Sequence, residues 1–274
     1  MEPTYTSIGN CSLRIACPSC KSDLVLTSES EVHCKSCGAS YPVRNGVIDL
    51  LPESTPERTP AQSSIDQEWF IHIYESRLWR RNPLISLLLG ISFDKECELI
   101  MQTANLKGNE TLLDLACGPG IYSRPFAKRL NRGTVVGLDL SMPVLNYATK
   151  KAQSEEINNL LFIHGDALEL PFPDNQFDVV NCCGAFHLFP YLEVLQNIKR
   201  ILKPGGCFTV AVGWERIPGG LGKKHRDFYY RKAGVYLFYK DELESLIGQA
   251  GFTDVECLHA KGVGWLIMSG VKPQ

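Results

Sequence analysis

The sequence contains neither a long apolar run nor an excess of positive charge. Its longest apolar stretch, LISLLLGISF from Leu84, is too short to cross a bilayer, so we expect no membrane span. The N-terminal MEPTYTSIGN has no basic segment followed by an apolar one, so we expect no signal peptide and a cytoplasmic protein. With 28 basic and 30 acidic residues, the net charge is -2, which is not the footprint of a nucleic-acid-binding chain, although it does not address a local basic patch.

Cysteine, in contrast, is abundant, with 11 residues. Disulfides are rare in the cytosol, and an odd number argues against a fully paired framework. Two C-x2-C pairs, Cys17 with Cys20 and Cys34 with Cys37, match the ligand pattern of a closed four-thiolate zinc site. The alternatives are two free pairs or a redox pair, but a redox pair needs a βαβ context, and DLVLT, ASYPV and GVIDLL read as strands and turns. We therefore predict one structural Zn²⁺.

A Pro-, Ser- and Thr-rich stretch, PESTPERTPAQSS, separates this segment from the rest of the chain. We place a zinc ribbon at 1–54, a linker at 55–65 and a second domain at 66–274. The second domain begins with a helical segment over 66–106, in which Trp69, Ile73 and Leu78 recur at near-helical spacing and Pro83 breaks the run. These helices either cap the core or roof a substrate pocket with aromatic walls, and both interpretations stay open.

From Thr111 onward, strand and helix patterns alternate, as in a parallel sheet. The strand TLLDL leads into a turn in which Gly118 and Gly120 lack a Cβ, so a ligand can approach the backbone. The next strand ends at Asp139, about 20 positions later, where a carboxylate can accept hydrogen bonds from ribose hydroxyls. The dinucleotide fingerprint G-x-G-x-x-G is absent, because the turn continues as GPGIYS. These features predict a cofactor that contains adenosine.

Five segments together resemble the class I S-adenosylmethionine (SAM) methyltransferases, especially the quinone-biosynthesis branch: LLDLACGPG, GLDLS, HGDALELPFPDNQFDVVNCCGAFHLF, IKRILKPGGCFTV and FYKDELESLIGQAGFTDVE. One departure is Ala116, which replaces the first glycine of the family's D/E-x-G-x-G-x-G motif. The resemblance implies an α/β, doubly wound, mostly parallel seven-stranded sheet that binds SAM. The N-terminal segment, up to YPVRNGVIDLLP, resembles the zinc ribbons of methyltransferase-activator subunits and of bacterial rRNA guanine methyltransferases.

The resemblance also implies roles for individual residues. Asp114 would lie near the methionine amino group, and the backbone of Ala116 and Gly118 would face the methionine portion. Asp139 would hold the ribose. The remaining positions would surround the adenine (Leu140, Ser141, Met142, Asp166 and Ala167) or line the sulfonium region (Cys183).

His187 is the candidate catalytic residue, because it follows the fourth strand at the edge of the sheet where ligands bind. It could take a proton from the acceptor, or it could only shape the pocket, and many relatives with different acceptors carry a histidine here. Two other chemistries are not indicated. The sequence NCCG lacks the Pro-Cys of a nucleophilic cysteine mechanism, and Asn/Asp-Pro-Pro-Tyr/Phe, typical of exocyclic amine methylation, is absent as well.

Basic and aromatic residues alternate in the segment 214–238, which contains KKHRDFYYRK. This segment could grip single-stranded nucleic acid or form a lid over a small aromatic or lipid-like acceptor. Through Pro60 the ribbon carries five basic and seven acidic residues, the wrong balance for gripping RNA. We therefore predict methyl transfer to a small, hydrophobic or aromatic acceptor such as a quinol, phenol or polyketide-like molecule. The alternatives are an rRNA or tRNA base methyltransferase that docks through the ribbon, and a non-catalytic binding module. The oligomeric state stays open.

Overall fold

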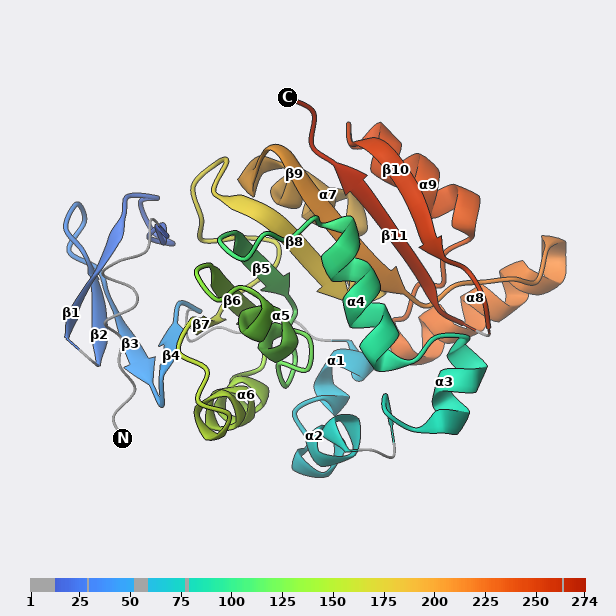
Figure 1. Cartoon of the computed structure of the whole chain (residues 1–274), viewed down its shortest axis with the longest axis horizontal. Coiled ribbons are helices and arrows are strands. Elements are labelled where there is room, and N and C mark those ends of the chain that lie inside the picture. The colour runs from blue at the N-terminus through green and yellow to red at the C-terminus, as the bar shows by residue number, and fades with distance from the viewer. Residues whose placement is uncertain (1–12, 29, 52–58, 77–78, 263) are drawn as a thin grey trace.

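The computed structural model describes residues 13–28, 30–51, 59–76, 79–262 and 264–274 (Figure 1). Its first strands are β1 (Leu24–Ser28), β2 (Glu31–Cys34), β3 (Ser40–Arg44) and β4 (Val47–Asp49). Four helices follow: α1 (Pro60–Ser64), α2 (Glu68–Glu75), α3 (Pro83–Leu89) and α4 (Phe93–Thr103). The alternating part comprises β5 (Thr111–Leu115), α5 (Ser123–Arg129), β6 (Thr134–Asp139), α6 (Met142–Ser154), β7 (Leu160–His164), β8 (Phe177–Cys183), the short 3₁₀ helix η2 (Phe186–Leu188), α7 (Tyr191–Ile201) and β9 (Leu202–Val212). The chain ends with α8 (Gly219–Ala233), α9 (Lys240–Gln249), β10 (Thr253–His259) and β11 (Leu266–Val271).

One sheet of 11 strands runs through the molecule, in the order β1-β2-β3-β4-β7-β6-β5-β8-β9-β11-β10. The neighbouring strands β7, β6, β5, β8 and β9 are parallel to one another. Beyond β9, β11 pairs antiparallel with β9, and β10 pairs antiparallel with β11. The predicted seven-stranded sheet is therefore wrong in its strand number. The reason is that β4 of the ribbon pairs in parallel with β7, so the ribbon strands extend the same sheet (Figure 1).

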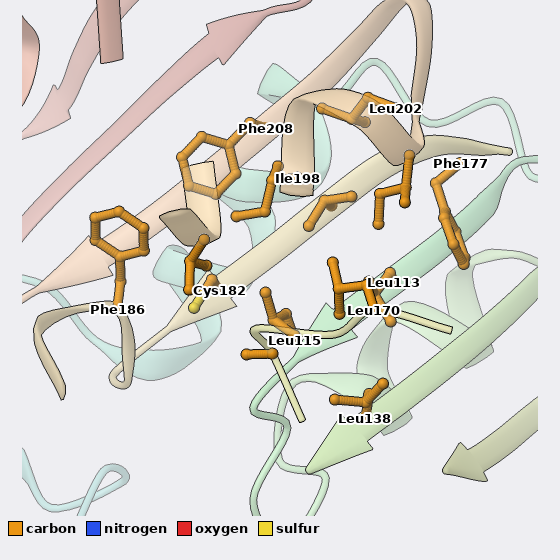
Figure 2. Close-up of a cluster of buried hydrophobic side chains, with 14 of the residues drawn as sticks. Leu113, Leu115, Leu138, Leu170, Phe177, Cys182, Phe186, Ile198, Leu202 and Phe208 are labelled. Atoms are coloured by element: carbon orange, nitrogen blue, oxygen red, sulfur yellow. The ribbon is translucent and has the colours of Figure 1, made fainter. Parts of the chain in front are cut away.

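The strands of the central sheet bury both faces, as expected of parallel strands covered by helices. Leu113 and Leu115 of β5 pack on one side with Ile198 of α7, and Leu112 packs on the other side with residues of α4 and α5. Figure 1 shows α4 and α5 in front of the sheet and α7 and α9 behind it. Figure 2 shows the α7 side, where Cys182 is one of the fully buried side chains. This core holds the carboxyl ends of β5 to β8 in fixed register.

The ribbon is packed onto the second domain by shared core residues and hydrogen bonds. Its Ile48 and Leu50 belong to the same buried cluster as the residues of β5 and α7. The Ala16 N–H donates to Pro171 O at 2.8 Å, and Gln176 exchanges two hydrogen bonds of 2.8 Å with the backbone of Arg14. The ribbon is therefore fastened both by the segment that precedes β1 and by the segment around β4.

The residues that recur at near-helical spacing in the helical segment are not the ones that its first helices bury. Of the predicted apolar set, Leu78 lies outside the described residues, and Trp69 and Ile73 are 61% and 43% exposed. Ile71 is buried instead, on the helix α2, which ends at Glu75. The predicted break at Pro83 is the start of α3, where the Asn82 side chain caps the helix.

Part of the predicted linker forms a helix. Residues 52–58 lie outside the described residues, but Thr59 caps α1 in a capping box with Gln62. Helix α1 contacts α8, and a Cβ added to Gly234 would meet the Thr59 side chain at 2.7 Å. No helix within the described ranges is long and apolar enough to cross a membrane.

Candidate cofactor site and metal cluster

A cavity of about 440 Å³ opens at the carboxyl ends of β5, β6, β7 and β8. We call it the cofactor cavity. The strand order reverses between β5 and β8, since the chain moves outward through β6 and β7 and then returns to β8 and β9. Ligands of open α/β sheets bind at such a switch point. The position of the cavity thus follows from the order in which the strands are connected.

The turn after β5 brings backbone groups to the cavity wall. Ala116, Gly118 and Gly120 have positive φ values of 53°, 54° and 75°. This region is open to glycine but costs an alanine roughly 1 kcal/mol or more, so Ala116 carries local strain. A Cβ on Gly120 would meet Ala148 and Phe162 at 3.4 Å, whereas around Gly118 the nearest atom is 3.9 Å away, on Ile65. Gly118 therefore leaves free space beside its backbone on the cavity side.

Asp139 connects the two turns that frame the cavity. Its Oδ2 accepts the Gly118 N–H at 2.8 Å, and its Oδ1 accepts the Ser141 N–H at 2.9 Å. The Ser141 hydroxyl caps α6 by accepting the Val144 N–H, and it donates to Asp66 at 2.5 Å. The carboxylate at the end of β6 therefore holds both the glycine turn and the start of α6 in place.

Most of the predicted cofactor residues lie together in the cavity wall. These are Ala116, Gly118, Asp139, Leu140, Ser141, Asp166, Ala167 and Cys183, and His187 lines the cavity as well. Three predicted residues do not line it, namely Asp114, Gly120 and Met142.

Asp114 lies beneath the cavity wall rather than in it. Its carboxylate accepts hydrogen bonds from the Ser123 hydroxyl at 2.5 Å and the Asn181 amide at 2.8 Å. Burial raises the pKa of Asp114 to about 6, and the two hydrogen bonds oppose that rise. Since the side chain is only 1% exposed, any effect of Asp114 on a ligand acts through its neighbours or its field.

Three residues that the sequence analysis did not single out also contribute to the cavity wall. Ile65 and Tyr74 line the cavity, together with Tyr122, which directly follows the glycine turn. The Tyr122 hydroxyl donates to Glu96 at 2.7 Å, and Glu96 is fully buried and also accepts the Trp265 indole N–H at 3.1 Å. The guanidinium of Arg80 pairs with the same carboxylate. This buried ion pair holds the aromatic wall of the cavity and satisfies the charge of Glu96.

The cysteines after β8 are not set up as nucleophiles. Burial raises the pKa of Cys182 and raises the pKa of Cys183 well above its ordinary value, with the Asp114 charge adding to both effects. Both thiols therefore stay protonated near neutral pH, whereas the nucleophile of cysteine chemistry is the thiolate. Cys183 donates instead to Asn181 Oδ1 at 3.1 Å.

The four predicted metal ligands come together in the ribbon. The sulfur atoms of Cys17, Cys20, Cys34 and Cys37 all lie within 4.8 Å of one another. Two repeated turns place them: the Lys21 N–H donates to Cys17 O at 2.8 Å, and the Gly38 N–H donates to Cys34 O at 3.0 Å. Sulfur atoms at these separations match a tetrahedral zinc with Zn–S distances of about 2.3 Å. Four thiolates complete the coordination, so the site suits a structural zinc.

A polar contact links the ribbon to the cofactor cavity. At the end of β7, His164 Nδ1 lies 2.7 Å from Asp49 Oδ1 of β4, and its Nε2 lies 3.1 Å from the carbonyl oxygen of Leu140. Arg44 also pairs with Asp49 at 3.3 Å. Leu140 lines the cavity between Asp139 and Ser141. The ribbon carboxylate therefore orients an imidazole that in turn holds the backbone of the cavity wall.

We expect Asp49→Asn to weaken binding of S-adenosylhomocysteine about 3- to 10-fold, the effect of one hydrogen bond of about 0.5–1.5 kcal/mol. Isothermal titration calorimetry measures the change, and zinc content should not change. The matched control is Asp23→Asn, which removes a carboxylate of the same ribbon from an exposed pair with Arg14. Equal affinities of the two variants would show that Asp49 does not support the cavity wall.

Known families match both parts of the chain. A family described as "Methyltransferase domain" matches residues 112–206, and one described as "Trm112p-like protein" matches residues 15–46. Demethylmenaquinone methyltransferase of Oceanobacillus iheyensis is 34% identical over 218 residues, which are 70% of this chain and 90% of that protein. The enzyme of the same name from Listeria welshimeri is 38% identical over 143 residues, or 51% of this chain and 59% of that protein.

A solved structure supports the fold. Phosphoethanolamine N-methyltransferase 2 of Haemonchus contortus, in complex with SAM, matches with a TM-score of 0.61 at 19% identity, over 86% of this chain and 62% of that one. The cofactor cavity, the four-cysteine cluster and these matches lead to one assignment. The chain belongs to the class I SAM-dependent methyltransferases, and it carries a Trm112p-like zinc ribbon in front of its catalytic domain.

Proposed function

We propose that this methyltransferase transfers the methyl group of SAM to a small aromatic or hydrophobic acceptor of the quinol or phenol class. The observation that carries this proposal is a second cavity of about 1040 Å³, which we call the outer cavity. It shares Thr59 and the residues from His187 to Pro190 with the cofactor cavity, so the two cavities adjoin along η2 and its C-terminal end. Four tyrosines contribute to its walls: Tyr191, Tyr230, Tyr236 and Tyr239.

In this proposal, Asp139 holds the ribose, and Asp166 and Ala167 contact the adenine. The sulfonium then lies toward Cys183 and His187, where the two cavities meet. Methyl transfer from a sulfonium is an in-line displacement by a donor that is already activated, so the protein mainly has to align the acceptor with the methyl group. The tyrosine rings in the walls of the outer cavity suit the face of an aromatic acceptor. The demethylmenaquinone methyltransferases among the relatives support an acceptor of this class.

The proposal is tested by feeding methyl-labelled methionine to the source organism with and without the gene. We expect at least one labelled small aromatic metabolite to disappear in the deletion strain, with the labelled marks of rRNA and tRNA unchanged. Loss of an rRNA or tRNA mark with a complete set of labelled small molecules would overturn the proposal.

His187 is proposed to shape the junction rather than to act as a base. Burial lowers the pKa of His187 to about 4, so the imidazole is neutral at pH 7 and is a weak proton acceptor. Its Nδ1 accepts the Gly213 N–H at 3.4 Å, an interaction that leaves the proton of the neutral ring on Nε2. His187 then offers the acceptor a hydrogen-bond donor.

We expect His187→Ala to lower kcat/KM about 10-fold, while the pH profile keeps its shape between about pH 5.5 and 8.5. The reason is the direction of the His187 pKa shift. Because this pKa is lowered to about 4, the imidazole becomes charged only below about pH 4 and does not titrate within this pH range. The measurement is a pH–rate profile with the acceptor that the labelling experiment identifies. A rate limb near pH 6 to 7 that is present in the wild type and lost in the variant would instead show a general base.

A further inference from the structure

One face of α8 lines the outer cavity, and the charged residues of this face are mostly cationic. The lining positions Lys223, then Arg226 and Asp227, then Tyr230 and Arg231 recur every three or four residues, as expected for one helical face. Lys224 and Lys232 belong to the same helix but do not line the cavity. Three cationic side chains therefore border the cavity from this helix, against one acidic side chain.

Arg226 is held rigidly in the cavity wall. Its side chain is only 18% exposed and pairs with Glu242 at 3.2 Å. Its guanidinium lies over the rings of Tyr236 and Tyr239, at 4.6 and 4.7 Å from their centroids, and also donates to the Tyr236 hydroxyl. Glu242 thus balances the charge of Arg226, and the stacked rings fix its plane.

Lys223 and Arg231 supply the charge that is not balanced. Within the described part of the chain, neither side chain has an acidic partner within 4 Å. Asp227 opposes them with a single negative charge, so an excess of positive charge borders the cavity. Cationic side chains beside tyrosine rings provide the chemistry that binds an aromatic molecule with an acidic substituent.

We infer that the methyl acceptor is itself anionic: an aromatic compound that carries a carboxylate or a phosphate, bound by Lys223 and Arg231. This inference rests on the proposed function and adds the substrate's charge to it. The acceptor spans the outer cavity, with its reacting atom at His187 and its acidic group at α8. An RNA backbone is a poorer fit than a small anion, because the ribbon carries more acidic than basic residues through Pro60 and adds no cationic surface to that of α8.

The test separates the small molecules of the source organism on an anion exchanger at about pH 8 into retained and unretained pools. Each pool is incubated with the full chain and methyl-labelled SAM, with an RNA pool alongside. We expect the label in a product that the exchanger retains. The double variant K223Q/R231Q should raise the KM for this product's precursor by about 30-fold or more, from the loss of two charge-assisted hydrogen bonds.

The matched control is K224Q/K232Q, which removes the same number of charges from the same helix outside the cavity and should change KM less than two-fold. Calorimetry with S-adenosylhomocysteine, unchanged in both double variants, verifies the fold and the cofactor site. Label only in an unretained product, or equal KM changes in the two double variants, would overturn this inference and leave the proposed function standing. Label in RNA alone, or in no small-molecule pool, would overturn the proposed function.

Discussion

Replacing Asp139 with alanine should weaken binding of S-adenosylhomocysteine by about 100-fold or more. In the proposed complex its carboxylate accepts charge-assisted hydrogen bonds from the ribose hydroxyls, each of about 1.5–3 kcal/mol. The same carboxylate accepts the Gly118 and Ser141 N–H groups at 2.8 and 2.9 Å. The variant therefore loses direct ligand contacts and also the anchor of the two turns that frame the cavity. Isothermal titration calorimetry measures the loss.

The matched control for this prediction is Asp178→Ala. Asp178 also accepts a backbone N–H at the start of β5, from Thr111 at 2.8 Å, and pairs with Lys203, but it does not line either cavity. It should lower the melting temperature and leave the affinity unchanged. If Asp139→Ala lowered the melting temperature in the same way and bound the ligand within about three-fold of wild type, Asp139 would be a structural residue only.

Replacing Cys34 with serine should remove the zinc and unfold the ribbon. Structural zinc in small modules contributes about 10–16 kcal/mol of apparent binding free energy, which is also folding free energy. The remaining three thiolates leave the tetrahedral site incomplete, and the two C-x2-C turns are no longer held together by a shared metal ion. We expect about one zinc per wild-type chain, well under half of that in the variant, and a lower melting temperature. Metal analysis by mass spectrometry and a thermal scan measure both effects.

Cys257→Ser is the control, because Cys257 lies in β10 and is distant in sequence and sheet order from the cluster. It should keep the zinc content. The destabilisation by Cys34→Ser should extend to β7, since the Leu50 N–H donates to His164 O at 3.0 Å and β4 pairs with β7. Zinc content unchanged in Cys34→Ser would contradict the metal assignment.

The parts of the site that could be predicted from the sequence are those whose geometry depends on residues close together in the chain. The four metal ligands depend on two local turns of the same kind, and these turns follow from the C-x2-C spacing. The glycine turn directly follows β5 and Asp139 is the last residue of β6, so parallel pairing of the two strands places them side by side. Ala116, which replaces the first glycine of the family's motif, has a positive φ of 53°.

The parts that sequence analysis missed depend on contacts between distant segments. Asp49 and His164 are 115 residues apart, and nothing in the local pattern of β4 indicates that it pairs with β7 and enlarges the sheet. Tyr74 lines the cavity and Trp69 is exposed, because the phase of a short helix is set by the surface on which it packs. Thr59 lies in a stretch whose composition indicated a linker, yet it borders both cavities.

The central claim is that the cofactor binds with its sulfur directed toward the outer cavity. A crystal structure of the protein with S-adenosylhomocysteine tests this claim most directly. The account predicts the ribose at Asp139, the adenine at Asp166 and the sulfur facing His187 at the junction with the outer cavity. A ligand bound in the same cavity with its sulfur turned away from His187, or bound elsewhere on the chain, would contradict it.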